Sequence, residues 1–270
     1  MLELNKVTKT FNPGTLDEVR ALQGVDLRME EGDFVVVLGT NGSGKSTLLN
    51  AVAGTFPLDS GTIILDGNNI TKKNEHQRAK YIGRVFQNPF SGTAPDMTIA
   101  ENLALASLRG KPRGLGIALS QRMMTQFRDR VSALNMQLED RLTNVMGLLS
   151  GGQRQALTLL MATWLKPRLL LLDEHTAALD PKTARKVIQI TEDIVSRDNL
   201  TTLMVTHSMQ QAINLGNRII MMNKGRIAYE FDAEDKRRLR VNDLLALFDE
   251  IRRKEQLDTA TAEMIEKNYV

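Results

Sequence analysis

The stretch GTNGSGKSTLLN, residues 39–50, follows the apolar run FVVVL and matches the pattern G-x-x-x-x-G-K-[ST]. Glycines here let the backbone wrap closely around phosphate oxygens, and the following helix adds the positive end of its dipole. Lys45 supplies charge for the β- and γ-phosphates, and Ser46 offers a hydroxyl to Mg²⁺. A glycine turn with an incidental lysine is the alternative, which the flanking strand and helix patterns disfavour. The phosphate loop predicted to bind ATP or GTP consists of Gly39, Thr40, Asn41, Gly42, Ser43, Gly44, Lys45, Ser46 and Thr47.

A pair of carboxylates, Asp173 and Glu174, follows the apolar run LLLL. Asp173 is placed to bind Mg²⁺ through water, and Glu174 to polarise an attacking water. Acidic residues also solvate the ends of ordinary strands, so the pair gains its weight from the phosphate loop. Together the two motifs favour hydrolysis over phosphoryl transfer to a substrate.

The segment LLSGGQRQALTLLMA, residues 148–162, places a serine and two glycines directly before a helix. The free N–H groups at a helix N-terminus can bind an anion, which predicts a second phosphate-binding site. A glycine-containing helix cap without any ligand is the alternative. The residues concerned are Ser150, Gly151, Gly152 and Gln153.

The order of the motifs along the chain discriminates between these alternatives. The phosphate loop, a glutamine in RVFQNPF, LSGGQ, LLLLDE and a histidine after TTLMVT resemble the motifs of the ATP-binding subunits of ABC transporters. The resemblance covers roughly residues 1–230. It implies that Gly39 to Thr47 form the Walker A loop, with ATP and Mg²⁺ as the cofactors. It also implies that Asp173 and Glu174 are Walker B with its catalytic glutamate.

The same resemblance implies roles for residues outside these two motifs. Gln87 would touch Mg²⁺ and the attacking water, and His207 would contact the γ-phosphate as the switch histidine. Ser150 to Gln153 would be the signature motif, and Asp180 would belong to the D-loop. A lone histidine after a strand is usually a core or surface residue, and its position after TTLMVT favours the functional interpretation.

Two positions depart from the commonest pattern of the family. Phe11, in VTKTF, stands where an aromatic residue stacks on adenine, although tyrosine is commoner there. A simple core role is the alternative for Phe11. His175 stands where many relatives have proline, and we expect it to pack or to shape the loop.

The elements that must position these residues follow from the hydrophobic pattern. Continuous apolar runs before the phosphate loop, before Asp173 and before His207 are typical of buried parallel strands, whose carboxyl ends meet at one edge. Alternating segments in the first thirty residues predict antiparallel strands, and RIIMMNKGRIAYEF predicts a hairpin. We therefore expect an α/β P-loop NTPase core with a parallel sheet, an N-terminal antiparallel β subdomain and an inserted helical subdomain at about residues 88–166. The expected division is an ATPase domain at 1–230 and a charged helical extension at 231–270.

Composition excludes some classes of protein. The sequence of 270 residues has no cysteine, which excludes disulfides and thiolate chemistry. Its net charge of +3 is too small to argue for nucleic acid, and the basic run KRRLR lies in a tail with an excess of acidic residues. No apolar run reaches the roughly 18–20 residues that cross a bilayer, and the N-terminus lacks a secretory signal pattern.

The resemblance implies partners for this chain. Because one chain carries one phosphate loop and one signature, it implies a homodimer with composite ATP sites. Separate transmembrane permease subunits and an extracytoplasmic substrate-binding protein would complete an importer, on the cytoplasmic face of the inner membrane, with no nucleic acid. An amino acid such as tryptophan is the expected substrate. The alternatives are an exporter or lipoprotein-release complex, and a soluble ATPase acting on nucleic acid or ribosomes.

Overall fold

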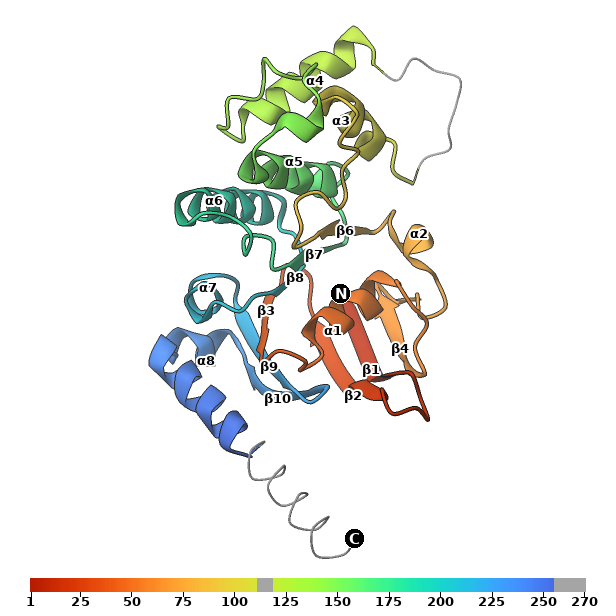
Figure 1. Ribbon diagram of the computed structural model, residues 1–270, viewed down its shortest axis with the longest axis vertical. Helices are drawn as coiled ribbons and strands as arrows, with labels where there is room; N and C mark the ends of the chain where they lie inside the picture. The colour runs from red at the N-terminus through yellow and green to blue at the C-terminus, as the bar shows by residue number, and fades with distance from the viewer. Residues whose placement is uncertain (111–118, 255–270) are drawn as a thin grey trace, which may run out of the picture.

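Two β-sheets and their covering helices make up the molecule. The computed structural model describes residues 1–110 and 119–254. In Figure 1 the larger sheet runs through the middle, with α3 to α6 above it and the smaller sheet at the lower right. The smaller sheet is antiparallel and has the order β2-β1-β4-β5, formed by Val19–Met29, Leu2–Phe11, Ser60–Leu65 and Asn68–Asn69. The larger sheet has the order β10-β9-β3-β8-β7-β6, formed by Arg226–Phe231, Arg218–Asn223, Phe34–Gly39, Thr202–Val205, Leu169–Asp173 and Ile82–Val85.

The larger sheet is parallel except for β10, which pairs antiparallel with β9. This confirms the predicted fold class and both predicted sets of strands, including the C-terminal hairpin. The helices are α1 Lys45–Ala53, α2 Glu75–Arg78, α3 Ile99–Ser107, α4 Gln121–Ser132, η1 Met146–Leu148, α5 Gly151–Thr163, α6 Pro181–Asp198, α7 Met209–Asn214 and α8 Ala233–Arg238.

The apolar runs are buried on both faces of the larger sheet. In β3, Val35 and Val37 pack with α1 and the antiparallel sheet, whereas Val36 and Leu38 pack with the helices of the other layer. Side chains of a strand point alternately to opposite faces, so a strand buried on both faces must be apolar throughout. This explains why FVVVL and LLLL show no polar alternation.

The register of the parallel strands aligns the ends that carry the polar motifs. Val37 of β3 lies opposite Val205 of β8, and Asp173 of β7 lies opposite the same Val205. The chain therefore leaves β3, β7 and β8 at one edge of the sheet, as predicted. The phosphate loop, Glu174 and His207 begin at that edge.

The segment at about 88–166 contains α3, α4, η1 and α5 within its described part and contributes no strand to either sheet there. Phe127 of α4 packs edge to face on Trp164 at 5.3 Å between ring centroids. Arg130 covers the same indole ring at 4.1 Å. The segment is helical as expected, while its boundaries as a subdomain stay a prediction.

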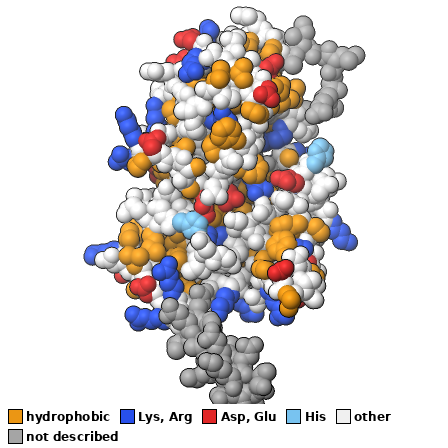
Figure 2. Space-filling model, viewed as in Figure 1, with side chains coloured by type: hydrophobic (Ala, Val, Ile, Leu, Met, Phe, Trp, Pro, Cys, Tyr) orange, Lys and Arg blue, Asp and Glu red, His pale blue; other side chains and the backbone are white. Residues whose placement is uncertain are grey.

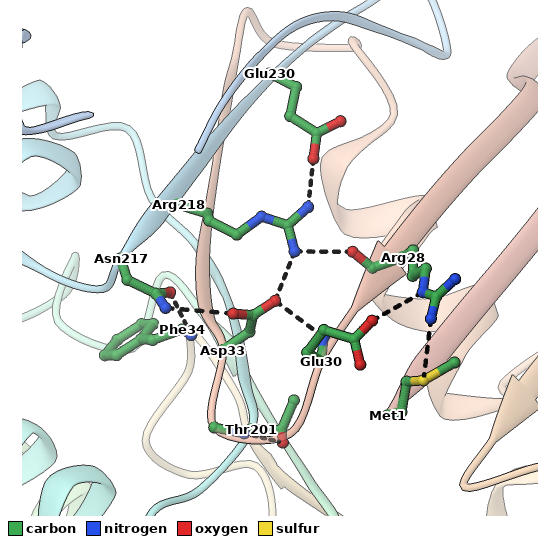
Figure 3. A network of polar contacts seen from close by, with 10 residues as sticks. Met1, Arg28, Glu30, Asp33, Phe34, Thr201, Asn217, Arg218 and Glu230 are labelled. Carbon is green, nitrogen blue, oxygen red and sulfur yellow. Dashed lines mark hydrogen bonds and ion pairs between the residues drawn. The ribbon is translucent and has the colours of Figure 1, made fainter. Parts of the chain in front are cut away.

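A polar network lies at the N-terminal end of β3, opposite the end that leads into the phosphate loop. Figure 3 shows Arg218, at the start of β9, between Asp33 and Glu230. Its Nη1 lies 2.6 Å from Asp33 Oδ2 and donates to the carbonyl oxygen of Arg28 at 2.8 Å. The network joins the strand that leads to the phosphate loop to β2 and β10.

The C-terminal region packs against β9, β10 and the segment that follows α7. Residues 241–254 are helical, with Leu244 and Ile251 buried. Lys236 of α8 donates to the backbone carbonyls of Leu215 and Gly216, just after α7. The rest of the predicted extension, residues 255–270, lies outside the described residues. Among the residues that are described, no helix has the length and apolarity needed to cross a membrane.

Candidate functional site

The phosphate loop connects β3 to α1 as a turn with glycines in left-handed conformations. Gly44 is the N-cap of α1 with a φ of 101°, and a Cβ there would lie 2.4 Å from the carbonyl oxygen of Ala21. Only glycine fits this position. No side chain caps α1, so its first N–H groups face the loop without a side-chain acceptor. The buried hydroxyl of Ser43 also has no partner.

Lys45 is held inside this loop. It is 5% exposed, and its Nζ donates to the carbonyl oxygens of Gly39 and Thr40 at 2.9 Å each. Burial lowers the pKa of the Lys45 ammonium, and the nearby carboxylates of Glu174 and Asp173 oppose this effect. The two predicted motifs therefore act on each other electrostatically.

Asp173, the last residue of β7, is largely buried beside a cation. Burial raises the pKa of its carboxyl, and the guanidinium of Arg84 in β6 opposes this rise. Arg84 Nη2 lies 3.9 Å from Asp173 Oδ2. Arg84 also donates to Asn50 Oδ1 of α1 at 2.5 Å. The sequence analysis missed Arg84. The one available signal was a charged residue within the apolar strand pattern IGRV.

Glu174 lies at the centre of the site. Its Oε2 accepts a hydrogen bond from Gln87 Nε2 at 3.0 Å, and its Oε1 lies 2.6 Å from His207 Nε2. The Glu174 side chain is 10% exposed, and that of His207 is 47% exposed. Figure 2 shows acidic side chains and a histidine together near the middle of the visible face. Three residues predicted from separate motifs thus meet in one hydrogen-bonded cluster.

A further set of polar groups fixes the loop that carries His207. Gln211 of α7 accepts from Thr206 Oγ1 at 2.7 Å and donates to Thr176 Oγ1 at 3.2 Å. Ser208 caps α7. These residues and Glu174 line a cavity of about 330 Å³. The sequence analysis did not identify Gln211, because no spacing rule links it to Thr176.

His175 points away from the cluster into the protein. It is 1% exposed, and its Nε2 lies 3.0 Å from Thr191 Oγ1 of α6, while its Nδ1 has no partner. Burial lowers the pKa of the imidazole to about 4. The expected packing role agrees with this burial.

The LSGGQ segment forms a capped helix start. Ser150 accepts from the backbone N–H of Gln153, and Gln153 Oε1 accepts from the N–H of Ser150, both at 3.3 Å. A Cβ on Gly152 would lie 1.9 Å from Thr183 Cγ2, so α5 and α6 approach closely at this glycine. Gln153 Nε2 also donates to the carbonyl oxygen of Met136 at 3.5 Å, and none of the hydrogen bonds of these residues reaches Glu174.

Asp180 and Phe11 lie in other local environments. Asp180 caps α6 by accepting from the N–H groups of Lys182 and Thr183 at 3.1 Å each, and the Thr183 hydrogen bond lowers its pKa. Phe11 ends β1 and packs edge to face on Phe56, with ring centroids 5.3 Å apart.

The predicted magnesium ligands offer oxygen atoms. Ser46 and Gln87 are exposed, and Gln87 uses its N–H on Glu174, which leaves its amide oxygen available. Hydroxyl, amide and carboxylate oxygens suit Mg²⁺ together with phosphates and water. No group of three or more His, Cys, Asp or Glu side chains that could hold a metal occurs in residues 1–110 and 119–254.

Comparison with known proteins gives consistent matches. A family model described as "ABC transporter" matches residues 22–177. The tyrosine transport ATP-binding protein of Clostridioides difficile (strain R20291) is 40% identical over 250 residues, which are 92% of this chain and 99% of that protein. The spermidine/putrescine import ATP-binding protein PotA of Aggregatibacter actinomycetemcomitans is 35% identical over 85% of this chain, which spans 57% of that longer protein. Among solved structures, the dimeric ATP-binding cassette MJ0796 in a post-hydrolysis state with ADP and Pi has a TM-score of 0.74 and 30% identity, over 86% of this chain and 99% of that one.

Proposed function

Because the chain belongs to the ABC transporter family, we propose that its ATP hydrolysis powers the uptake of a small solute, such as an amino acid, through separate membrane subunits. The chain binds ATP and hydrolyses it, as ATP-binding domains of this family do. The tyrosine transport relative, which matches almost end to end, supports an amino acid with an aromatic side chain as the solute.

The observation that carries the proposed catalytic chemistry is the cluster around Glu174. In the proposed mechanism the Glu174 carboxylate accepts a proton from the attacking water, and His207 and Gln87 orient the γ-phosphate and that water. Both neighbours already contact the two carboxylate oxygens. Lys45 then holds the β- and γ-phosphates.

The remaining parts of the nucleotide site follow from the residues around the phosphate loop. Ser46 and Asp173 would hold Mg²⁺, with Gln87 as a further oxygen ligand. Burial raises the pKa of the Asp173 carboxyl, and the nearby Arg84 guanidinium opposes this rise. Phe11 would stack on the adenine, supported from the side by Phe56.

A homodimer would complete each ATP site. Ser150 and the N–H groups at the start of α5 form an anion-binding helix end whose own contacts do not reach Glu174. The similarity to a dimeric cassette supports a head-to-tail arrangement in which this helix end closes over the ATP of the second copy.

Mixing two inactive variants tests the shared site. A heterodimer of Ser150→Phe and Lys45→Ala subunits would keep one site with an intact phosphate loop and an intact signature, whereas each parent homodimer has none. We expect both parents to be inactive and the mixture to recover at most half of the wild-type rate per dimer. A fully active Ser150→Phe homodimer, or a mixture as inactive as its parents, would contradict the composite site.

A groove between α2, α3 and α5 offers a place for the permease to bind. Its volume is about 910 Å³, and its walls come from α2, Arg84 of β6, α3 and α5. Apolar and basic side chains line it: Lys80, Leu105 and Leu108 are exposed, and Lys73 and Arg109 are partly buried. A peripheral subunit on the cytoplasmic face of the inner membrane would dock through this groove, and an extracytoplasmic binding protein would deliver the solute.

Uptake measurements test the transport function. Cells that lack the chain should lose uptake of labelled tyrosine or tryptophan, and the wild-type chain should restore it. The Leu105→Glu variant should keep ATP hydrolysis when purified but fail to restore uptake, because the charge lies in the groove and away from Glu174. Normal uptake of both aromatic amino acids without the chain would refute the aromatic substrate.

A further inference from the structure

We propose that His175 is a positioning residue for Glu174, acting through its hydrogen bond to Thr191 in the middle of α6. The inference rests on the proposed role of Glu174 in ATP hydrolysis. It concerns two buried residues, 16 positions apart, that no motif joins.

The backbone of Glu174 is strained. Its φ is 43°, in the left-handed region, which is sterically unfavourable for a residue with a side chain. Such a conformation persists only where several surrounding contacts fix it. Two are backbone hydrogen bonds: the N–H of Glu174 donates to Val205 O at 3.0 Å, and the N–H of Ala177 donates to Glu174 O at 2.9 Å.

His175 supplies a third restraint from the opposite side. The Glu174 side chain faces Gln87 and His207, whereas the imidazole of His175 is buried against Thr191, which is itself 0% exposed. The hydrogen bond therefore ties the residue after the catalytic carboxylate to a helix of 18 residues. Rotation of the Glu174 backbone out of its strained conformation would pull the imidazole away from α6.

The direction of this hydrogen bond follows from the partners of Thr191. The Thr191 hydroxyl donates its single hydrogen to Val187 O at 2.8 Å, so it accepts from His175 Nε2–H. This tautomer leaves a lone pair on Nδ1, which is buried without a partner. A buried unpaired polar atom is destabilising, and an apolar side chain at this position would avoid that cost. We therefore infer that a histidine stands at position 175 because of its hydrogen bond to Thr191 of α6.

Contacts with α6 fix both ends of the loop between Glu174 and that helix. Asp180 caps the first turn of α6, and Thr191 holds His175 from a later turn of the same helix. Thr176 is held from the other side by Gln211. Loss of the Thr191 bond would free the backbone at the end of this loop that carries the catalytic carboxylate.

Thr191→Val tests the inference, because valine keeps the shape and removes the acceptor. We expect kcat for ATP hydrolysis to fall about tenfold, equivalent to about 1.4 kcal/mol, with ATP binding and KM changed less than about twofold. Thr191→Ser, which keeps the hydroxyl, should recover most of the rate. The matched control is Thr163→Val on α5, a buried threonine whose hydroxyl donates to Leu159 O at 2.8 Å and touches no histidine. It should lose stability like Thr191→Val but keep its kcat.

His175→Leu, which removes the donor, is the second variant if Thr191→Val folds poorly, and it should lower kcat in the same way. In the Glu174→Gln background, Thr191→Val should cause no further loss, because its effect acts through the missing carboxylate. Wild-type kcat in a folded Thr191→Val or His175→Leu protein would overturn the inference. Equal losses in Thr163→Val, or a further tenfold loss on top of Glu174→Gln, would also overturn it. A Glu174→Gln protein with normal turnover would instead overturn the proposed role of Glu174, and the inference with it.

Discussion

Replacing Glu174 by glutamine removes one proton acceptor and leaves the shape of the site unchanged. The new amide keeps an oxygen for His207 Nε2, and its NH₂ group then faces Gln87, which can turn its own amide to offer the oxygen. The cluster therefore stays hydrogen-bonded, and ATP binding should be retained. What is lost is general base catalysis, which contributes about 10²–10⁴-fold. The expected cost is about 2.7–5.5 kcal/mol in the activation free energy.

Phosphate release at saturating Mg-ATP measures this loss, and equilibrium binding of a fluorescent ATP analogue measures retention of the nucleotide. Gel filtration with ATP should show more dimer for Glu174→Gln than for the wild type, because the sandwiched ATP persists. Glu192→Gln, on an exposed position of α6, is the matched control and should hydrolyse ATP at the wild-type rate. A kcat within threefold of wild type for Glu174→Gln would refute the assignment of the base.

Three further changes test other parts of the structure. Lys45→Ala should weaken ATP binding at least about tenfold in equilibrium titrations, because the counter-charge of the phosphates is lost; binding within twofold of wild type would contradict the phosphate-loop role. Arg218→Met removes the cation beside Asp33, which keeps its hydrogen bonds from the N–H of Glu30 and from Asn217 Nδ2, and should lower the free energy of unfolding in urea by about 1–3 kcal/mol, with the ATP affinity of the folded protein unchanged; a decrease below about 0.5 kcal/mol on the same scale would contradict this prediction. Burial lowers the pKa of Lys236 from 10.5 to about 8, so the folded protein binds fewer protons than the unfolded chain between these values, and this group makes stability rise with pH there. In urea denaturation at several pH values, the free energy of unfolding should rise less steeply with pH in Lys236→Met than in the wild type. Equal slopes in the two proteins would show that Lys236 does not cause the rise.

The sequence was sufficient to predict the position of the site residues that directly follow a buried strand. Apolar runs before the phosphate loop, Asp173 and His207 had to be buried parallel strands, and parallel strands end at a common edge. The register of β3, β7 and β8 confirms that geometry. Gln87 donates a hydrogen bond to Glu174, a contact that the sequence analysis did not predict, and its predicted contact with Mg²⁺ and the attacking water stays a prediction.

The contacts between side chains of different elements could not be predicted in this way. Arg84 reaches Asp173 because β6 pairs with β7, and the residues IGRV do not indicate which strand lies beside β6. In α3 the sequence left open which apolar residues face solvent. The structure buries Leu103 completely and leaves Leu105 51% exposed, because only one side of the helix packs on the core.

In the proposed mechanism, ATP binding changes the hydrogen-bond partners within the site. Lys45 donates two of its three N–H groups to carbonyl oxygens of the phosphate loop, which leaves one N–H and the charge for a bound phosphate. His207 likewise contacts Glu174 and must shift toward a γ-phosphate to contact it, which would free one oxygen of the carboxylate for water. A diphosphate could satisfy Lys45 but would leave His207 on Glu174. In the proposed mechanism only the triphosphate would contact both Lys45 and His207, and this difference would distinguish ATP from ADP.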